Sequence, residues 1–269
     1  MKKVFLIFTI FCFSILIETQ HSVSDASVKI SREQEKEVWR PCIEDFGFYD
    51  QGCIGTETYS NGDTYRGEFR NGRKNGEGTY TWVSGKQYVG QFKDNVAHGL
   101  GTFTWPDGEI YNGIFKNALP HGHGTTIYAD GDTYVGKFKD GEKHGHGKYT
   151  WTADRVSYVG EWKNGKRHGQ GIVESKSSSY KGSWLEDQAH GAGTFTWTDG
   201  SKCVGVFRHG EMHGYGTCIW AEGDVYTGYF AYDDYSGEGV YTLPSGKVLQ
   251  GIWRKGELVS SYKIFFSPH

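Results

Sequence analysis

Residues 63–82 read DTYRGEFRNGRKNGEGTYTW, and this stretch decides the fold. Its first half alternates, so Tyr65, Gly67 and Phe69 fall on one face of an extended strand. Asn71-Gly72 is a dipeptide that strongly favours a two-residue hairpin turn. The second half alternates again. The stretch therefore predicts an antiparallel β-hairpin.

The same hairpin pattern recurs nine times, mostly 23 residues apart. Self-similarity at a fixed period indicates one small unit stacked on copies of itself. A catalytic residue is usually singular, whereas nearly every prominent residue here has counterparts one repeat away. The recurring residues, predicted to lie along one face, are Tyr65, Gly67, Phe69, Tyr88, Gly90, Phe92, Tyr111, Gly113, Phe115, Tyr134, Gly136, Phe138, Tyr158, Gly160, Trp162, Tyr180, Gly182, Trp184, Gly205, Phe207, Tyr226, Gly228, Phe230, Gly251 and Trp253.

The alternation also predicts the register across each hairpin. We expect Tyr65 to face Tyr80. The same register places Gly67 opposite Gly78. It then places Phe69 opposite Gly76. Glycine has no Cβ, so the glycines leave room on this face for the neighbouring rings.

The recurring pattern YxGxF/WxxGxxHGxGxxxxxxG closely resembles the MORN repeat (membrane occupation and recognition nexus) over residues 55–256. The fold expected is all-β, an elongated single-layer antiparallel sheet of tandem hairpins. The resemblance implies a scaffold for protein interaction or an accessory to an enzyme domain, and the family name records a proposed link to membranes.

Some repeats depart from the pattern. Cys203 and Leu249 replace the leading tyrosine. The spacing is 24 residues before Tyr158 and 22 before Tyr180, and both boundaries lack the usual turn glycine. We expect a local bulge or kink at these two boundaries.

The chain is divided into four parts. Residues 1–20 resemble a secretory signal, because Lys2 and Lys3 precede a short apolar run; an uncleaved membrane anchor is the alternative. Residues 21–54 form an N-terminal segment, 55–256 the nine repeats and 257–269 a capping tail. The expected location is secreted or extracytoplasmic, in a periplasm or lumen.

Four cysteines follow the apolar run, and an even number in an exported chain indicates two disulfides. Cys42 and Cys53 are 11 positions apart, and their pairing would tie the N-terminal segment to the first strand. Cys203 and Cys218 occupy the positions of Tyr65 and Tyr80 six repeats later, so the register places them face to face. Two neighbouring free thiols are the alternative.

Repeated histidines invite a metal or catalytic hypothesis. His121, His123, His144 and His146 lie in neighbouring repeats and are the candidate zinc or copper ligands. Neighbouring repeats are about 10 Å apart, which is too far for one ion, so the simpler expectation is that each histidine orders its turn. We expect no metal, cofactor or catalytic residue, and the sequence has no phosphate loop, GxSxG or HExxH motif.

The remaining candidates concern binding. A net charge of -3 without a basic tract excludes nucleic acid as an expected partner and gives no attraction to anionic membranes. We expect a non-enzymatic scaffold for protein–protein interaction or self-assembly. Binding of glycans or cell wall through tryptophan rows, or of a phospholipid surface, are the alternatives. The tryptophans, which otherwise complete the ring stack, are Trp82, Trp105, Trp151, Trp197 and Trp220.

Overall fold

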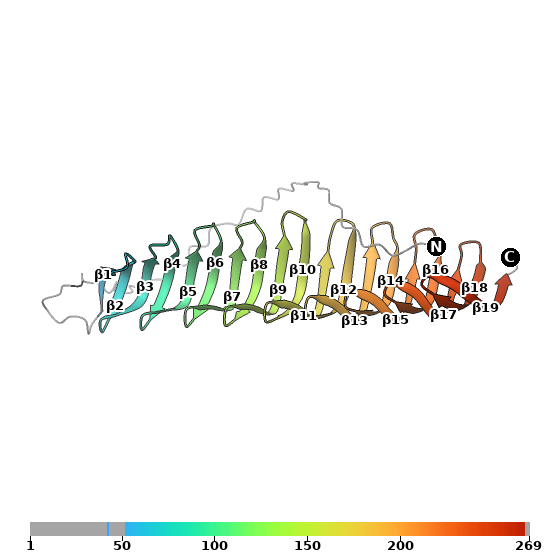
Figure 1. Cartoon of the computed structure of the whole chain (residues 1–269). Helices are drawn as coiled ribbons and strands as arrows, with labels where there is room; N and C mark the ends of the chain where they lie inside the picture. The colour runs from blue at the N-terminus through green and yellow to red at the C-terminus, as the bar shows by residue number, and fades with distance from the viewer. Residues whose placement is uncertain (1–41, 43–51, 267–269) are drawn as a thin grey trace, which may run out of the picture.

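The protein is one long ribbon in the computed structural model, which describes residue 42 and residues 52–266 (Figure 1). A single sheet of 19 strands makes up these residues. Each strand pairs antiparallel with the strands that precede and follow it in the chain. The predicted elongated, single-layer antiparallel sheet is confirmed. The predicted signal segment 1–20 and nearly all of the segment 21–54 lie outside the described residues.

The strands are short and follow one another with brief turns. In chain order they are β1 (Cys53–Thr58), β2 (Thr64–Arg70), β3 (Arg73–Thr81), β4 (Gln87–Lys93), β5 (Val96–Thr104), β6 (Ile110–Lys116), β7 (Leu119–Ile127), β8 (Thr133–Lys139), β9 (Glu142–Trp151), β10 (Val156–Lys163), β11 (Lys166–Glu174), β12 (Ser178–Leu185), β13 (Gln188–Trp197), β14 (Lys202–Arg208), β15 (Glu211–Ile219), β16 (Val225–Ala231), β17 (Asp234–Thr242), β18 (Lys247–Arg254) and β19 (Glu257–Phe266).

The turns inside the hairpins share a geometry that most of their residues favour. Asn71 and Gly72 between β2 and β3 both have positive φ, 51° and 67°. Positive φ at both central residues is the type I′ turn, whose twist matches that of the flanking strands. Asn, Asp and Gly tolerate this conformation best, which explains why they recur at these turns.

The predicted register is confirmed for two of its three pairs. Tyr65 pairs with Tyr80, and Gly67 pairs with Gly78. The third pair is wrong, because the register shifts after Gly67 and Phe69 pairs with Lys74. Gly76 instead pairs with a ring of the following strand, β4.

The shift is a β-bulge, and it recurs in every hairpin from β2–β3 to β18–β19. Gly76 has a φ of 75°, a conformation that glycine adopts without penalty. A bulge bends its strand and increases the local twist. Repeating it in each hairpin bends the whole sheet in the same direction.

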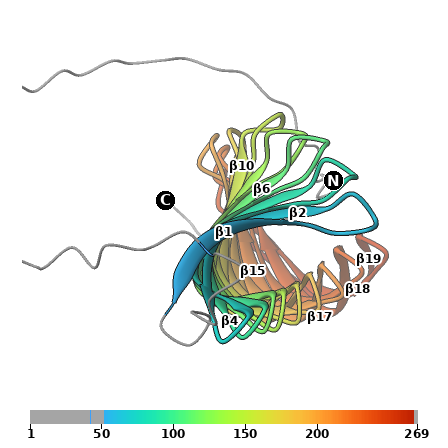
Figure 2. The ribbon, with the colours of Figure 1, turned by 90° about the vertical axis from the view of Figure 1, so that its left-hand side faces the viewer.

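The view along the ribbon shows that the sheet is curved (Figure 2). The rings are its buried side chains, so they lie on the concave side. We call this side the inner face and the opposite side the outer face. Tyr65 and Tyr134 are fully buried although the sheet has one layer. A single layer can cover rings so completely only by curving around them, so the inner face holds the core. Val135, between two core residues of β8, points the other way and is 54% exposed.

Each leading tyrosine lies over the glycine pair of its own hairpin. The Tyr134 hydroxyl donates a hydrogen bond to the carbonyl oxygen of Lys137 at 2.9 Å. A Cβ at Gly147 would meet the ring, with Tyr134 Cε2 only 2.6 Å away. The glycines therefore form a floor on which the ring lies, as the sequence predicts.

The two irregular boundaries contain no bulge, so that half of the expectation is wrong. The kink named as its alternative stays a prediction. β9 pairs with β10, and β11 with β12, without a register shift. The length differences are absorbed in the turns instead. After β11 the Ser175 hydroxyl oxygen accepts a hydrogen bond from the Ser178 N–H at 3.0 Å and closes a shorter turn.

The end of the sheet is the hairpin β18–β19. The segment predicted as a capping tail supplies β19, which pairs along β18. The described residues include no helix long and apolar enough to cross a membrane.

Candidate functional site

In each hairpin the first strand carries a second ring four residues after the position of the leading tyrosine, as Phe69 follows Tyr65. The residue of the second strand that pairs with this ring, Lys74 in the first hairpin, points into the inner face. We call these nine residues the inner column. They differ from repeat to repeat, unlike the rings around them: three are cationic, three are small and three are large and apolar. In chain order they are Lys74, Ala97, Pro120, Lys143, Arg167, Ala189, Met212, Tyr235 and Leu258.

Lys143 fills a cage of aromatic rings. Its Nζ lies 4.6 Å from the ring centroid of Tyr149 and 4.7 Å from that of Trp162. Tyr128 and Tyr134 complete the cage at 5.8 and 5.7 Å. Such distances allow attraction between an ammonium and the ring faces. Burial nevertheless lowers the pKa of Lys143, because the charged form has lost water.

Lys74 occupies the corresponding cage in the first repeat. Its Nζ lies 4.7 Å from the centroid of Tyr80 and donates a hydrogen bond to the Tyr59 hydroxyl at 3.0 Å. Burial lowers the pKa of this lysine as well. Two separate repeats therefore use the same inner-face position to hold a lysine among rings.

Arg167 stacks on a ring and is neutralised by an aspartate. Its guanidinium carbon lies 4.4 Å from the Trp184 ring centroid. Its Nε donates to Asp187 Oδ1 at 3.1 Å, and its terminal nitrogen donates to the Asp187 carbonyl oxygen at 2.7 Å. The arginine thus has fixed partners on both its face and its edge.

Two of the three large apolar column residues replace missing tyrosines. In the seventh repeat Cys203 stands where the tyrosine would be, and the Met212 methyl lies over the glycine floor. In the ninth, Leu258 lies over Gly251 in the same way. The column residue thus fills the volume of the leading tyrosine where that tyrosine is missing. In the eighth repeat, in contrast, Tyr235 stacks beside Tyr226 with 3.9 Å between ring centroids.

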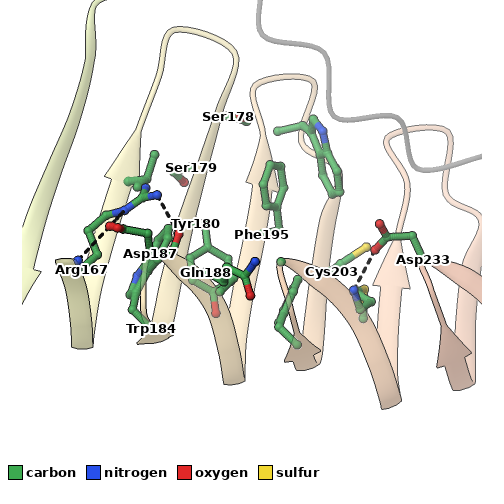
Figure 3. A pocket seen from close by; sticks show the side chains of 16 residues that line it. Arg167, Ser178, Ser179, Tyr180, Trp184, Asp187, Gln188, Phe195, Cys203 and Asp233 are labelled. Atoms are coloured by element: carbon green, nitrogen blue, oxygen red, sulfur yellow. Dashed lines mark hydrogen bonds and ion pairs between the residues drawn. The ribbon is translucent and has the colours of Figure 1, made fainter. Parts of the chain in front are cut away.

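In the sixth repeat Tyr180 lies over the glycine floor, but Ala189 leaves the place of a larger column side chain open, and a cavity of about 240 Å³ results (Figure 3). Arg167 of β11 and Met212 of β15 are among its lining residues. The cavity is otherwise lined mainly by rings from β12, β13 and β14, which are Tyr180, Trp184, Phe195, Trp197 and Phe207.

Asp233 is an acidic residue that borders the cavity, and its hydrogen bond in the described residues is to a backbone N–H and not to a cation. Asp233 Oδ1 accepts a hydrogen bond from the Met212 backbone N–H at 2.7 Å. Burial raises the pKa of this carboxyl group, and that hydrogen bond partly offsets the rise. Asp187, in contrast, is engaged by Arg167. The polar groups at the cavity can therefore hold a cationic or hydrogen-bonding ligand group.

The predicted cysteine pairs both lie at disulfide distance. Cys203 pairs with Cys218 across β14 and β15, with Cα atoms 4.1 Å apart. Cys42 and Cys53 have Cα atoms 5.0 Å apart, and the Cys42 N–H also donates to the Ile54 carbonyl oxygen at 3.0 Å. Cys203 also lines the cavity, so this pair supports one of its walls.

The four histidines proposed as metal ligands do not form a cluster. His123 and His146 are exposed on β7 and β9. His121 Nδ1 lies 3.5 Å from Asp140 Oδ1, beside the turn that follows β8. No group of three or more histidine, cysteine or carboxylate side chains gathers anywhere in the described residues.

The predicted tryptophan rows form the margin of the ring stack. Trp82 is half-buried, with its ring centroid 4.5 Å from that of Tyr80. Trp197 lies 4.4 Å from Phe195 in the same arrangement and also lines the cavity. These rings therefore serve the core and line the inner face at once.

The inner column was missed by sequence reasoning, although a signal for it exists. Six of its members directly precede the histidine of a His-Gly pair, as Lys143 precedes His144. The bulge explains the omission. Simple alternation places Gly76 opposite Phe69, whereas the bulge places Lys74 there.

Comparison with known proteins agrees with this architecture. The family model of the MORN repeat matches eight tandem segments, together well over half of the chain. They are residues 65–87, 88–110, 111–133, 134–153, 158–178, 180–202, 203–225 and 226–248. No curated protein matches the sequence.

Two solved structures are distant neighbours of the chain. The SAS-4 (dCPAP) TCP domain of Drosophila melanogaster, in complex with a proline-rich motif of Ana2 (dSTIL), is 12% identical with a TM-score of 0.36. The match covers 58% of this chain and 85% of that chain. The wild-type TCP10 domain of Danio rerio CPAP is 13% identical with a TM-score of 0.29, over 77% of this chain and 99% of that chain.

Proposed function

Because the chain belongs to the MORN repeat family, we propose that it is a non-enzymatic scaffold whose inner face binds an extended segment of a partner protein. The observation that carries this proposal is the cavity beside Ala189. It opens within a row of rings that otherwise fill the inner face with the chain's own side chains. The repeats follow one another about every 10 Å along the inner face, so this face is long enough to contact an extended partner beyond the cavity.

The chemistry of the cavity favours binding over catalysis. Arg167 is held by Asp187, and Asp233 accepts a backbone hydrogen bond. These groups are engaged in fixed structural contacts. A ring-lined cavity with a few fixed polar groups is typical of a recognition site.

Two cysteine pairs at disulfide distance support an extracytoplasmic location, where such bonds persist. We include secretion into an oxidising compartment in the proposal. A protein partner, or a second copy of this chain, would then belong to the same compartment.

A photo-crosslinking experiment tests the scaffold. A benzophenone amino acid replaces Gln188, which is exposed at the edge of the cavity, or Val135 on the outer face as the matched control. Both proteins are incubated with native extract, and crosslinked proteins are identified by mass spectrometry.

We expect one protein to crosslink at position 188 and not at 135, and the purified protein to bind directly. Crosslinking at position 135 alone would overturn the inner face as the binding surface. Binding to liposomes or glycans, with no protein captured at either position, would favour one of the alternative functions.

A further inference from the structure

The cavity beside Ala189 corresponds to the volume that a lysine fills in two other repeats. Ala189 pairs with Trp184 as Lys143 pairs with Phe138, so the two residues hold the same place in their hairpins. An alanine side chain ends at Cβ. The space that the Lys143 chain and ammonium occupy in the fourth repeat is empty in the sixth.

The rings around the two positions also correspond. Lys143 contacts Tyr134 in the first strand of its own hairpin. It also contacts Tyr149, six residues further along the chain, and Trp162, in the first strand of the next hairpin. The counterparts around Ala189 are Tyr180, Phe195 and Phe207, and all three line the cavity. The sixth repeat therefore retains most of the cage and lacks its occupant.

The charges around the cavity favour a cation. Arg167 lines the cavity, and the Asp187 carboxylate neutralises it through an ion pair at 3.1 Å. Asp233 contributes a carboxylate at the cavity that a positive ligand group would stabilise. The chain as a whole carries a net charge of -3, which adds a weak attraction for basic partners.

We propose that this cavity binds the alkylammonium side chain of a lysine from the partner segment. The proposal rests on the proposed function, because the lysine is supplied by the bound protein. The partner's lysine takes the place that Lys143 holds in its own repeat. The Asp233 carboxylate and the ring faces together offset the water that the ammonium loses, and the aliphatic stem fills the apolar part of the cavity.

Methyl NMR provides a direct test. The chain contains two methionines, and Met212 lines the cavity, so a ¹³C-methyl label on methionine reports on the site. The probes are Nα-acetyl-lysine amide and Nα-acetyl-norleucine amide, which has the same apolar stem without the charge. We expect the lysine amide to shift the Met212 methyl signal saturably, with at least tenfold tighter binding than the norleucine amide.

Two variants isolate the site. Ala189→Lys supplies the missing occupant from the chain itself and should abolish the probe-induced shift. Ala97→Lys places a lysine at the same column position four repeats away and should leave the shift intact. Asp233→Asn keeps an acceptor for the Met212 N–H but removes the charge, so we expect roughly fivefold weaker binding of the lysine amide.

The outcomes separate the two proposals. Equal binding of both amides, or an unchanged shift in Ala189→Lys, would overturn the lysine site. If a partner still crosslinks at position 188, the scaffold function survives that result. Loss of the shift in Ala97→Lys would show that the effect is not specific to the cavity, and would overturn the site as well.

Discussion

Met212 lies over Gly216 in the seventh repeat, in the place that a tyrosine ring takes in seven other repeats. The Met212 Cε is 2.7 Å from where a Cβ on Gly216 would be. Cys203 and Cys218 occupy the ring positions on the two paired strands. A flexible methionine and a sulfur pair thus fill the volume that two tyrosines fill elsewhere.

Met212→Ala should destabilise the protein by about 2–5 kcal/mol, the usual cost of deleting a large buried side chain. The loss arises because the glycine floor beneath is left uncovered and the adjacent cavity enlarges. Urea denaturation of the variant and of wild type measures it. Val206→Ala, on the exposed outer face of the same hairpin, is the control and should change stability by no more than about 0.5 kcal/mol. Equal effects would contradict the role of Met212.

Substituting the leading tyrosine of a repeat should lower the stability of the protein less than substituting a glycine of the floor beneath it. Tyr134→Phe removes only the hydroxyl that donates to Lys137 and should cost about 0.5–1.5 kcal/mol. Gly147→Ala places a methyl group into the Tyr134 ring and should cost more than that. Denaturant unfolding of both variants gives the comparison. A Gly147→Ala protein as stable as wild type would show that the floor is not required.

High pH should unfold the protein through its buried tyrosines. Burial raises the pKa of Tyr111 and of Tyr180 from 10.0 to about 12. The folded state therefore retains protons that the unfolded state releases above pH 10. The stability that these tyrosines contribute is fully present below pH 10 and is lost as pH rises from 10 toward 12. We expect tyrosinate absorbance near 295 nm and loss of β-sheet circular dichroism to change together in this window. Tyrosine ionisation near pH 10 with the sheet intact would contradict the burial.

The hairpins and their inner rings were predictable from the sequence because alternation and turn dipeptides are local signals. Asn71-Gly72 sets its turn by its own backbone preferences. The pairing of Cys203 with Cys218 followed from the register near the tyrosine, which the bulge does not disturb.

The bulge itself was not predictable from alternation. Gly76 has no side chain to mark which face it belongs to, so period-2 counting continues through it unnoticed. Every residue between the bulge and the turn was therefore misassigned, including Lys74. The cavity was missed for the same reason, since it depends on which residue fills the inner column and on curvature that the bulges produce together.

Both cysteine pairs should appear as disulfides in a non-reducing peptide map of the protein. The short loop between Cys42 and Cys53 should contribute about 2–3 kcal/mol to the stability of the first hairpin, because the bond restricts the unfolded chain. Recovery of a Cys42–Cys203 peptide, or alkylation of all four thiols without reduction, would contradict the pairing. Reduced and unreduced samples of one preparation provide the control.

Lys143 should tolerate loss of its charge better than loss of its length. Burial lowers its pKa below the ordinary 10.5, so the ammonium is less stable in the cage than in water, although the rings offset part of that cost. Lys143→Met keeps the apolar stem, and we expect its stability to lie within about 1 kcal/mol of wild type at neutral pH. Lys143→Ala should cost about 2 kcal/mol or more, because the rings lose their filling.

The pH dependence gives an independent check on the Lys143 cage. In the window just below pH 10.5 the unfolded lysine holds a proton that the folded one releases. Wild type should therefore gain stability relative to Lys143→Met as pH rises through that window, while the tyrosine contributions cancel in the comparison. Parallel denaturant titrations of the two proteins from pH 7 upward measure the difference. A constant difference, or one that moves in favour of the methionine variant, would show that the cage does not depress this pKa.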